Sequence, residues 1–175
     1  MSRLVHLAGS LAALLMLAGC GVSGKIERSA CPRLSMAPDA LDFTRFDGQG
    51  HDITDVVLSG HLSSIPAKCG RSSDTVVQTE LNIVATLTRG PAAKSNTANA
   101  TAIVAVLRGD AVVDETDVPL TAVFPPNVST VTVTTDQLTL NFPVAANGSA
   151  AGYRVVVAFR LSPEELAFNR KGLGR

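Results

Sequence analysis

The sequence predicts an all-β domain: an antiparallel sandwich of two packed sheets, with an immunoglobulin-like or fibronectin-like topology and a short C-terminal helix. Several segments alternate apolar and polar residues with the period of two that marks half-buried strands. Turn-forming residues separate these segments at short intervals, as in antiparallel sandwiches. A single flat sheet would leave apolar side chains uncovered, so two packed sheets are expected. A β-barrel of similar size is the alternative.

The N-terminal part of the domain gives mixed signals. Prolines and glycines interrupt residues 31–50, and such residues break regular structure. One helical turn is expected at residues 38–41, and the side chains of Leu41, Phe43 and Phe46 can reach a core. Residues 54–62 are then predicted to form a strand.

The central segment, residues 75–88, has the clearest strand pattern. One set of alternate positions is mostly apolar and the other is polar. The apolar set consists of Val77, Leu81, Ile83, Ala85 and Leu87. Residues 89–99 are expected to form a loop and residues 100–107 a strand. A turn at residues 108–110 leads into a hairpin strand over residues 111–115.

The C-terminal part continues the alternation and then changes period. Further strands are predicted at residues 120–124, 128–134, 138–142 and 153–161. Ser162 followed by Pro163 and Glu165 has the features of a capping box at a helix start. A helix over residues 163–170 should follow, and residues 171–175 should form a frayed tail.

Residues 1–19 are predicted to be a lipoprotein signal peptide. Arg3 precedes an apolar run of about twelve residues, which is shorter than the roughly twenty that a membrane-spanning helix needs. The ending Leu17-Ala18-Gly19-Cys20 resembles the lipobox of bacterial lipoproteins. The resemblance implies that Cys20 is lipidated and becomes the mature N-terminus, so that acyl chains anchor the protein to a membrane. An ordinary signal peptide with a chance cysteine is the alternative.

The residue after the cysteine bears on localisation. In lipoproteins of this kind, Asp at that position often marks retention in the inner membrane. Gly21 stands there instead, which favours the outer membrane, facing the periplasm, over the inner membrane. Residues 20–30 are expected to be the lipidated cysteine and a flexible tether. Residues 31–170 would then form the β-sandwich domain.

Two further cysteines, Cys31 and Cys69, lie in the exported part of the chain. Such a pair in a secreted protein usually forms a disulfide. Closing a loop of about 40 residues would contribute roughly 4 kcal/mol in the chain-entropy model. The alternatives are two free thiols or a metal site. No Cys-x-x-Cys or Cys-x-x-His spacing supports a metal site.

The composition argues against several functions. Fifteen Lys and Arg balance fifteen Asp and Glu, so the excess of positive charge that nucleic-acid binding needs is missing. Aromatic residues make up 4% of the chain and Trp is absent, which disfavours sugar binding by ring stacking. We expect no cofactor, and the chain is long enough to fold without a metal.

The best catalytic candidates are His51, Asp52, Asp55 and His61. Two imidazoles and two carboxylates could bind a metal or act in acid–base chemistry. Their spacing matches no known metal motif, and surface polar residues at a strand entrance are the preferred interpretation. The chain also lacks the Gly-x-Ser-x-Gly motif and the glycine-rich phosphate loops. We therefore assign no catalytic residue and no metal ligand, and we expect a protein that is not an enzyme.

Several phrases resemble a family of small lipoproteins of Gram-negative bacteria, especially alphaproteobacteria. The phrases are Cys31-Pro32-Arg33, Thr44-Arg45-Phe46, residues 52–57, residues 89–93 and residues 161–170. The resemblance implies a secreted lipoprotein domain with a cysteine pair, and it carries no known activity. The expected function is binding of another cell-envelope component through loops or an exposed strand edge. The alternatives are a small apolar-ligand binder and a metal-assisted hydrolase.

Overall fold

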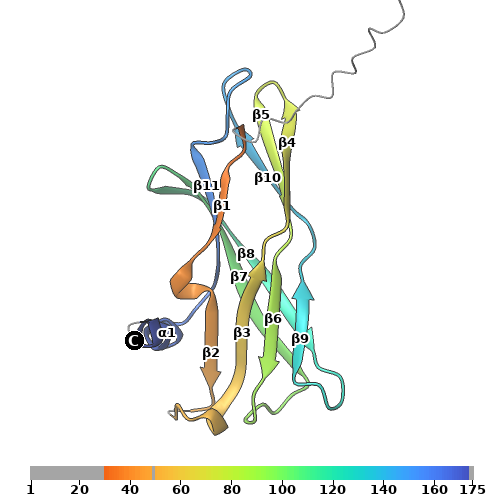
Figure 1. Cartoon of the computed structure of the whole chain (residues 1–175), viewed down its shortest axis with the longest axis vertical. Coiled ribbons are helices and arrows are strands. Elements are labelled where there is room, and N and C mark those ends of the chain that lie inside the picture. Colours follow the sequence, from red (N-terminus) through yellow and green to blue (C-terminus); the bar gives the residue numbers. More distant parts are fainter. Residues whose placement is uncertain (1–29, 49, 174–175) are drawn as a thin grey trace, which may run out of the picture.

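The computed structural model describes residues 30–48 and 50–173 and confirms the predicted all-β sandwich with one C-terminal helix (Figure 1). The predicted signal peptide, Cys20 and nearly all of the tether lie outside the described residues. Two short 3-10 helices, η2 (Pro38–Ala40) and η3 (Ile53–Asp55), precede the longer helix α1 (Pro163–Leu173). The strands are β1 (Arg33–Met36), β2 (Asp42–Phe46), β3 (Val56–Ser64), β4 (Ala67–Ser73), β5 (Val76–Leu81), β6 (Val84–Arg89), β7 (Thr97–Arg108), β8 (Ala111–Val123), β9 (Thr130–Thr134), β10 (Leu138–Pro143) and β11 (Tyr153–Phe159).

The strands form two layers. The first layer is one sheet with the order β1-β11-β7-β8, in which β1 runs parallel to β11 and the other pairs are antiparallel. The second layer consists of two antiparallel sheets placed end to end, β2-β3-β6-β9 and β10-β5-β4. In Figure 1 the chain passes directly from β3 to β4, from β5 to β6 and from β9 to β10. The second layer is therefore one broad sheet with a break across its middle, and the described strands form layers with open edges and not a closed barrel.

The core lies between these layers and takes residues from both. Phe43 of β2 contacts Phe159 of β11 edge-on, with ring centroids 4.8 Å apart. The largest fully buried side chains are Phe124, Phe142, Leu58, Leu62, Leu81, Ile83, Leu87, Leu120, Val77, Val104, Val155 and Val157. Most of these lie at alternate positions of their strands, as the period-two pattern predicts.

The break in the second layer corrects one prediction. Residues 75–88 form two strands, β5 and β6, and not one, although Leu81 at the end of β5 and Ile83 in the break are both buried. The amide of Asn82 donates to the Pro66 carbonyl, and its side chain donates to the Thr135 carbonyl. These bonds satisfy the polar groups that leave the strand ladder, so the apolar alternation continues across the break.

Other boundaries also differ from the prediction. The strands β1, β2 and β4 were not predicted, and β4 carries polar side chains on both faces, which hides the usual alternation. Residues 111–115 and 120–123 belong to one strand, β8, that runs through Pro119. The predicted loop at residues 89–99 is shorter because β7 begins at Thr97, and α1 extends to Leu173 beyond the predicted end.

Several turn predictions are confirmed. Residues 38–41 contain the 3-10 turn η2. Gly109 turns the β7–β8 hairpin with a φ of 63°, a conformation that glycine adopts without steric cost. Asn147 has a φ of 55° in the turn between β10 and β11. The α1 capping box is present, because the amide of Ser162 donates to the Glu165 carboxylate and the amide of Glu165 donates to the Ser162 hydroxyl.

Candidate functional site

The predicted disulfide is present and ties one end of the domain together. Cys31 and Cys69 are bonded with an S–S distance of 2.05 Å. Cys31 precedes β1 of the first layer, and Cys69 lies on β4 of the second layer. The bond therefore joins the two layers at the end where the described chain begins, the upper end in Figure 1.

The structure does not bring the four catalytic candidates together. His61 on β3 contacts the Asp42 carboxylate of β2 at 2.6 Å, whereas the ring of His51 lies against Phe46. Phe46 pairs with Val56 on β3, five positions from His61, or about 17 Å at the usual strand rise.

Asp52 and Asp55 have a structural role of their own. They form a reciprocal capping box around η3, in which each side chain accepts from the backbone of the other residue. Among the described residues, no group of three or more His, Cys, Asp or Glu side chains is placed to hold a metal ion.

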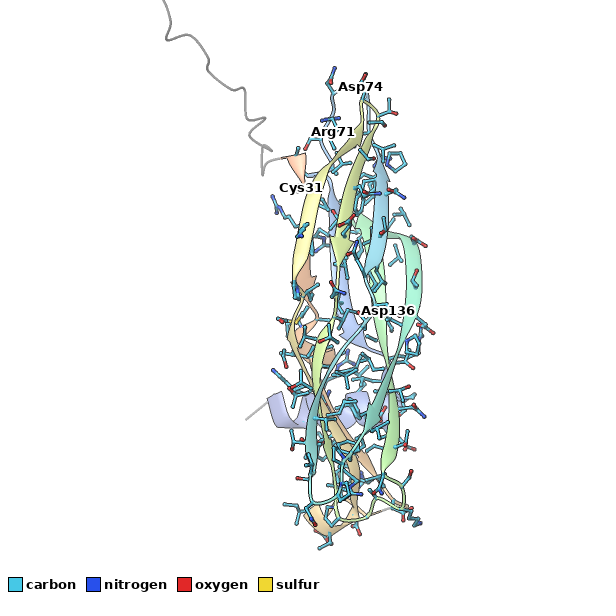
Figure 2. The ribbon with its side chains drawn as sticks, turned by 90° about the vertical axis from the view of Figure 1, so that its right-hand side faces the viewer. Cys31, Arg71, Asp74 and Asp136 are labelled. Atoms are coloured by element: carbon cyan, nitrogen blue, oxygen red, sulfur yellow. A yellow bond between two sulfur atoms is a disulfide. The ribbon has the colours of Figure 1, made fainter. Side chains whose placement is uncertain are left out.

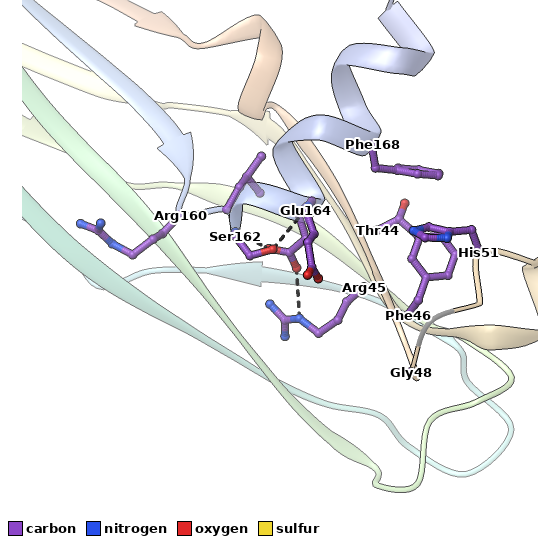
Figure 3. A pocket seen from close by; sticks show the side chains of 11 residues that line it. Thr44, Arg45, Phe46, Gly48, His51, Arg160, Ser162, Glu164 and Phe168 are labelled. Carbon is purple, nitrogen blue, oxygen red and sulfur yellow. Dashed lines mark hydrogen bonds and ion pairs between the residues drawn. The ribbon is translucent and has the colours of Figure 1, made fainter.

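A hollow of about 550 Å³ lies between α1, β2 and the residues around His51 (Figure 3). Phe168 of α1 contacts Phe46 edge-on at 5.1 Å and stacks on His51 at 6.0 Å. Arg45 pairs with Glu165 at 3.1 Å and also donates to the Asn99 carbonyl. The rings pack on each other and the Arg45–Glu165 charges neutralise each other, and these contacts hold α1 against β2.

Arg160, at the rim of the same hollow, is also neutralised. It donates to the Asp117 carboxylate at 2.8 Å and to the Glu115 carboxylate at 2.7 Å. The hydrogen bond to Asp117, followed by the one to Glu115, raises the pKa of the Arg160 guanidinium. This cation therefore links β8 to the end of β11 through two carboxylates.

The second layer ends on one side in a long uncharged edge, formed by β9 and then β10. Figure 2 faces this side of the molecule, with Asp136 between the two strands. Asp136 is the single charged residue of the segment 130–143. Within the described residues, no strand pairs with the outer side of β9 or β10.

The registers identify which backbone groups of this edge are unpaired. The Val144 amide donates to Thr75 and the Arg89 amide donates to Ser129, which fixes the residues that bond to β5 and β6. In an antiparallel ladder, the residues between those that bond to the neighbouring strand point their N–H and C=O groups away from that strand. These residues are Thr130, Thr132, Thr134, Thr139 and Asn141, whereas the outward carbonyl of Pro143 accepts from the Tyr153 hydroxyl. We call this row the open edge.

A cleft of about 530 Å³ adjoins the β10 part of the open edge. It separates β10 from the end of the β7–β8 hairpin, where residues 111–117 are all exposed. Its floor is aromatic: Tyr153 lies 5.2 Å from Phe142, and its hydroxyl donates to the Pro143 carbonyl. The lining residues are Val106, Arg108, Val113, Asp114, Thr139, Leu140, Asn141, Phe142, Pro143 and Tyr153. We call this space the β10 cleft.

The other long edge, β8, is protected against pairing. The Phe124 amide donates to the Asn96 carbonyl, so the even-numbered residues of this part of β8 bond to β7. The backbone groups that point away from β7 therefore belong to residues 115, 117, 119, 121 and 123. Glu115 and Asp117 carry charge there, and Pro119 has no N–H to donate. Charges and proline are devices that prevent strand addition.

The remaining edges are covered, charged or short. Helix α1 packs beside β2, where the Asn169 side chain donates to the Asp42 carbonyl at 2.6 Å. On β4, Lys68 and Arg71 are exposed cations and Cys69 is tied to Cys31. The first-layer edge β1 is four residues long. Of the edges in the described residues, the open edge is the one without such protection.

Sequence reasoning named an exposed strand edge as a possible binding surface but did not identify which one. The signal was present in the uncharged alternation Thr-Val-Thr-Val-Thr of residues 130–134. The strand order decides which strands are edges, and that order depends on contacts between distant residues. The β10 cleft was missed for the same reason, because β7, β8, β10 and β11 contribute to it together.

Within the described residues, no helix has the length and apolar character required to cross a membrane. No protein-family model, no curated protein and no solved structure matches the chain.

Proposed function

We propose that this protein is a lipoprotein, lipidated at Cys20 and held at the outer membrane facing the periplasm, and that its domain binds another cell-envelope protein without catalysing a reaction. The Leu17-Ala18-Gly19-Cys20 sequence and the short apolar run before it support the anchor. Gly21 supports the outer membrane. Cys31 begins the domain eleven positions after Cys20, so a short tether would hold the disulfide end nearest the membrane.

The observation that carries the binding role is the open edge. A row of unpaired backbone donors and acceptors is a surface on which another chain can add as a strand. Stable domains normally block such edges, and this chain does so at β8, β2 and β4. Leaving one long edge uncharged and uncovered has a stability and solubility cost that a binding role explains.

The absence of catalysis is supported by what the polar candidates do. Asp52 and Asp55 cap η3, and His61 pairs with Asp42 on the neighbouring strand. The two aspartates therefore stabilise a local turn, and His61 lies apart from them on β3.

The proposal is tested on the full chain with a C-terminal tag in its own cells. Labelled palmitate should enter the protein, and a Cys20→Ala variant should lose the label. Chemical cross-linking before membrane extraction, followed by mass spectrometry, should recover the same envelope protein repeatedly. Recovery of abundant bystanders alone would count against a specific partner, and unchanged labelling of the variant would rule out Cys20 as the lipidated residue.

A second candidate function is binding of a small apolar ligand, and the β10 cleft favours it. Its volume of about 530 Å³ lies in the range of small-molecule sites, and Val106, Leu140 and Phe142 give it apolar walls. Native mass spectrometry of the chain beginning at Gly21, purified from cells, should then show a bound mass. A Leu140→Arg variant should lose that mass, whereas a Val123→Arg variant at the far end of β8, outside the cleft lining, should keep it.

A further inference from the structure

The β10 cleft lies where the next strand of the second layer would place its side chains. Leu140 and Phe142 of β10 point inward, and Val113 and Asp114 of the β7–β8 hairpin form the opposite wall. A strand added beside β10 would continue the sheet and direct every second side chain into this space. The open edge and the cleft are therefore two parts of one site.

We propose that the occupant of this site is an extended, uncharged segment of the partner protein, which pairs with β10 and places alternate apolar side chains in the β10 cleft. This inference rests on the proposed function and specifies the partner's chemistry. It concerns the six residues Leu138–Pro143, a length of about 20 Å that matches an ordinary strand.

The backbone groups favour a polypeptide over a lipid. Thr139 and Asn141 each present an outward N–H and C=O, spaced at the repeat of a strand. An acyl chain has no donors or acceptors for these groups. A strand offers a hydrogen-bonding partner to each of them.

The side chains define the pattern of the segment. On the cleft side the neighbours are Leu140 and Phe142, so apolar residues are preferred there. On the solvent side the neighbours are Thr139 and Asn141, so polar residues without charge are preferred. The expected segment therefore alternates apolar and neutral polar residues, as β9 and β10 themselves do.

The β7–β8 hairpin helps to explain why one strand fits here. Its residues Ala111 to Asp117 are exposed on both faces, so the hairpin projects past β10 as an open wall. Its apolar side chains Val112 and Val113 are 56% and 53% exposed. A single strand laid along β10 would cover Val113 and leave the rest of the hairpin in place.

The test places a photo-cross-linking amino acid, p-benzoyl-phenylalanine, at one position at a time in the full-length tagged chain in its own cells. Thr139 on the open edge is the test site, and Lys68 on β4 is the matched control because it is an exposed residue on the opposite edge of the same sheet. The cross-linked material is digested, and the attached peptide is sequenced by mass spectrometry.

The inference expects a partner peptide of alternating apolar and neutral polar residues from position 139 and none from position 68. A partner attached at position 68 alone would overturn the inference and leave the proposed function standing. A lipid, or a second copy of this chain, attached at position 139 would overturn it in favour of that occupant. If neither position captures a partner and the tagged chain recovers none, the proposed function fails as well.

A second variant tests the hydrogen bonds themselves. Thr139→Pro removes an N–H that faces away from β5, so the sheet keeps its own bonds. Recovery of the partner should fall about tenfold, the equivalent of a lost bond of roughly 1.4 kcal/mol. Thr121→Pro makes the same change at an outward position of β8 and should change recovery less than twofold.

The alanine variant completes this comparison. Thr139→Ala keeps the N–H and should bind like the parent chain. Circular dichroism and melting of each purified variant show that the domain is folded. Equal recovery with folded Thr139→Pro and folded Thr139→Ala would overturn strand addition at β10.

Discussion

Gly60 on β3 lies directly opposite Phe43 on β2, and the Phe43 ring fills the space that a side chain at position 60 would take. A Cβ at Gly60 would stand 2.3 Å from a ring carbon of Phe43 and 2.8 Å from a methyl group of Leu87. Both neighbours are buried in the core. This glycine therefore makes room for the Phe43–Phe159 contact that joins the two layers.

A Gly60→Ala substitution should lower the free energy of unfolding by about 1–3 kcal/mol, because the added methyl group overpacks a buried contact. Denaturant unfolding of the chain beginning at Gly21 measures this. Gly70→Ala is the control, since a Cβ at Gly70 on β4 has no atom within 4 Å. It should leave stability unchanged or raise it slightly. Equal losses in both variants would refute the packing explanation.

Thr79 on β5 is a second sensitive position in the core. Its side chain is fully buried, and its hydroxyl has no hydrogen-bond partner among the described residues. Thr79→Val replaces the hydroxyl with a methyl group of similar size and should raise the free energy of unfolding by about 1–3 kcal/mol. Thr86→Val is the comparison, because the Thr86 hydroxyl bonds to Ser63, and that variant should gain nothing. A destabilised Thr79→Val protein would show that the hydroxyl has a partner.

Removal of the disulfide should destabilise the domain strongly. The bond closes a sequence separation of 38 residues, for which the chain-entropy model gives about 4 kcal/mol. A Cys31→Ser, Cys69→Ser double variant should therefore unfold at lower denaturant than the oxidised parent. Thiol titration of the denatured, unreduced parent beginning at Gly21 should find no free cysteine. Detection of two thiols there would contradict the pairing.

The α1 capping box offers a local prediction. Glu165 accepts from the Ser162 amide and pairs with Arg45, so Glu165→Ala should cost about 1 kcal/mol of helix stability. Amide hydrogen exchange in α1 should then speed up about fivefold. The neighbouring Glu164 is exposed, and Glu164→Ala should leave exchange close to the parent rate. Similar acceleration in both variants would mean that the capping box does not hold the helix.

The local elements of this fold could be predicted from the sequence where side-chain periodicity is strong. Alternation located β5, β6, β7 and β11, and the Ser162–Glu165 spacing located the start of α1. The strand β4 could not be found this way. Its residues are polar or small and only Cys69 and Gly70 are half-buried, so they show no period-two burial pattern.

The candidate site depended on long-range order that periodicity does not contain. The alternation of Val131 and Val133 shows that β9 is half-buried but not that it is an edge. Only pairing with β6, more than forty residues earlier, leaves its other side open. His51 and His61 do not form a cluster for a related reason. Residues that are close in sequence lie far apart in space when an extended strand separates them.

The disulfide also determines how the domain carries mechanical load. Tension from the preceding chain enters at Cys31, next to β1, a four-residue edge strand that a pull could peel away from β11. Because Cys31 is bonded to Cys69, that force passes directly into β4 and through it into the second layer. A pulling force at the start of the domain is therefore distributed over both layers, and the hydrogen bonds between β1 and β11 do not carry it alone.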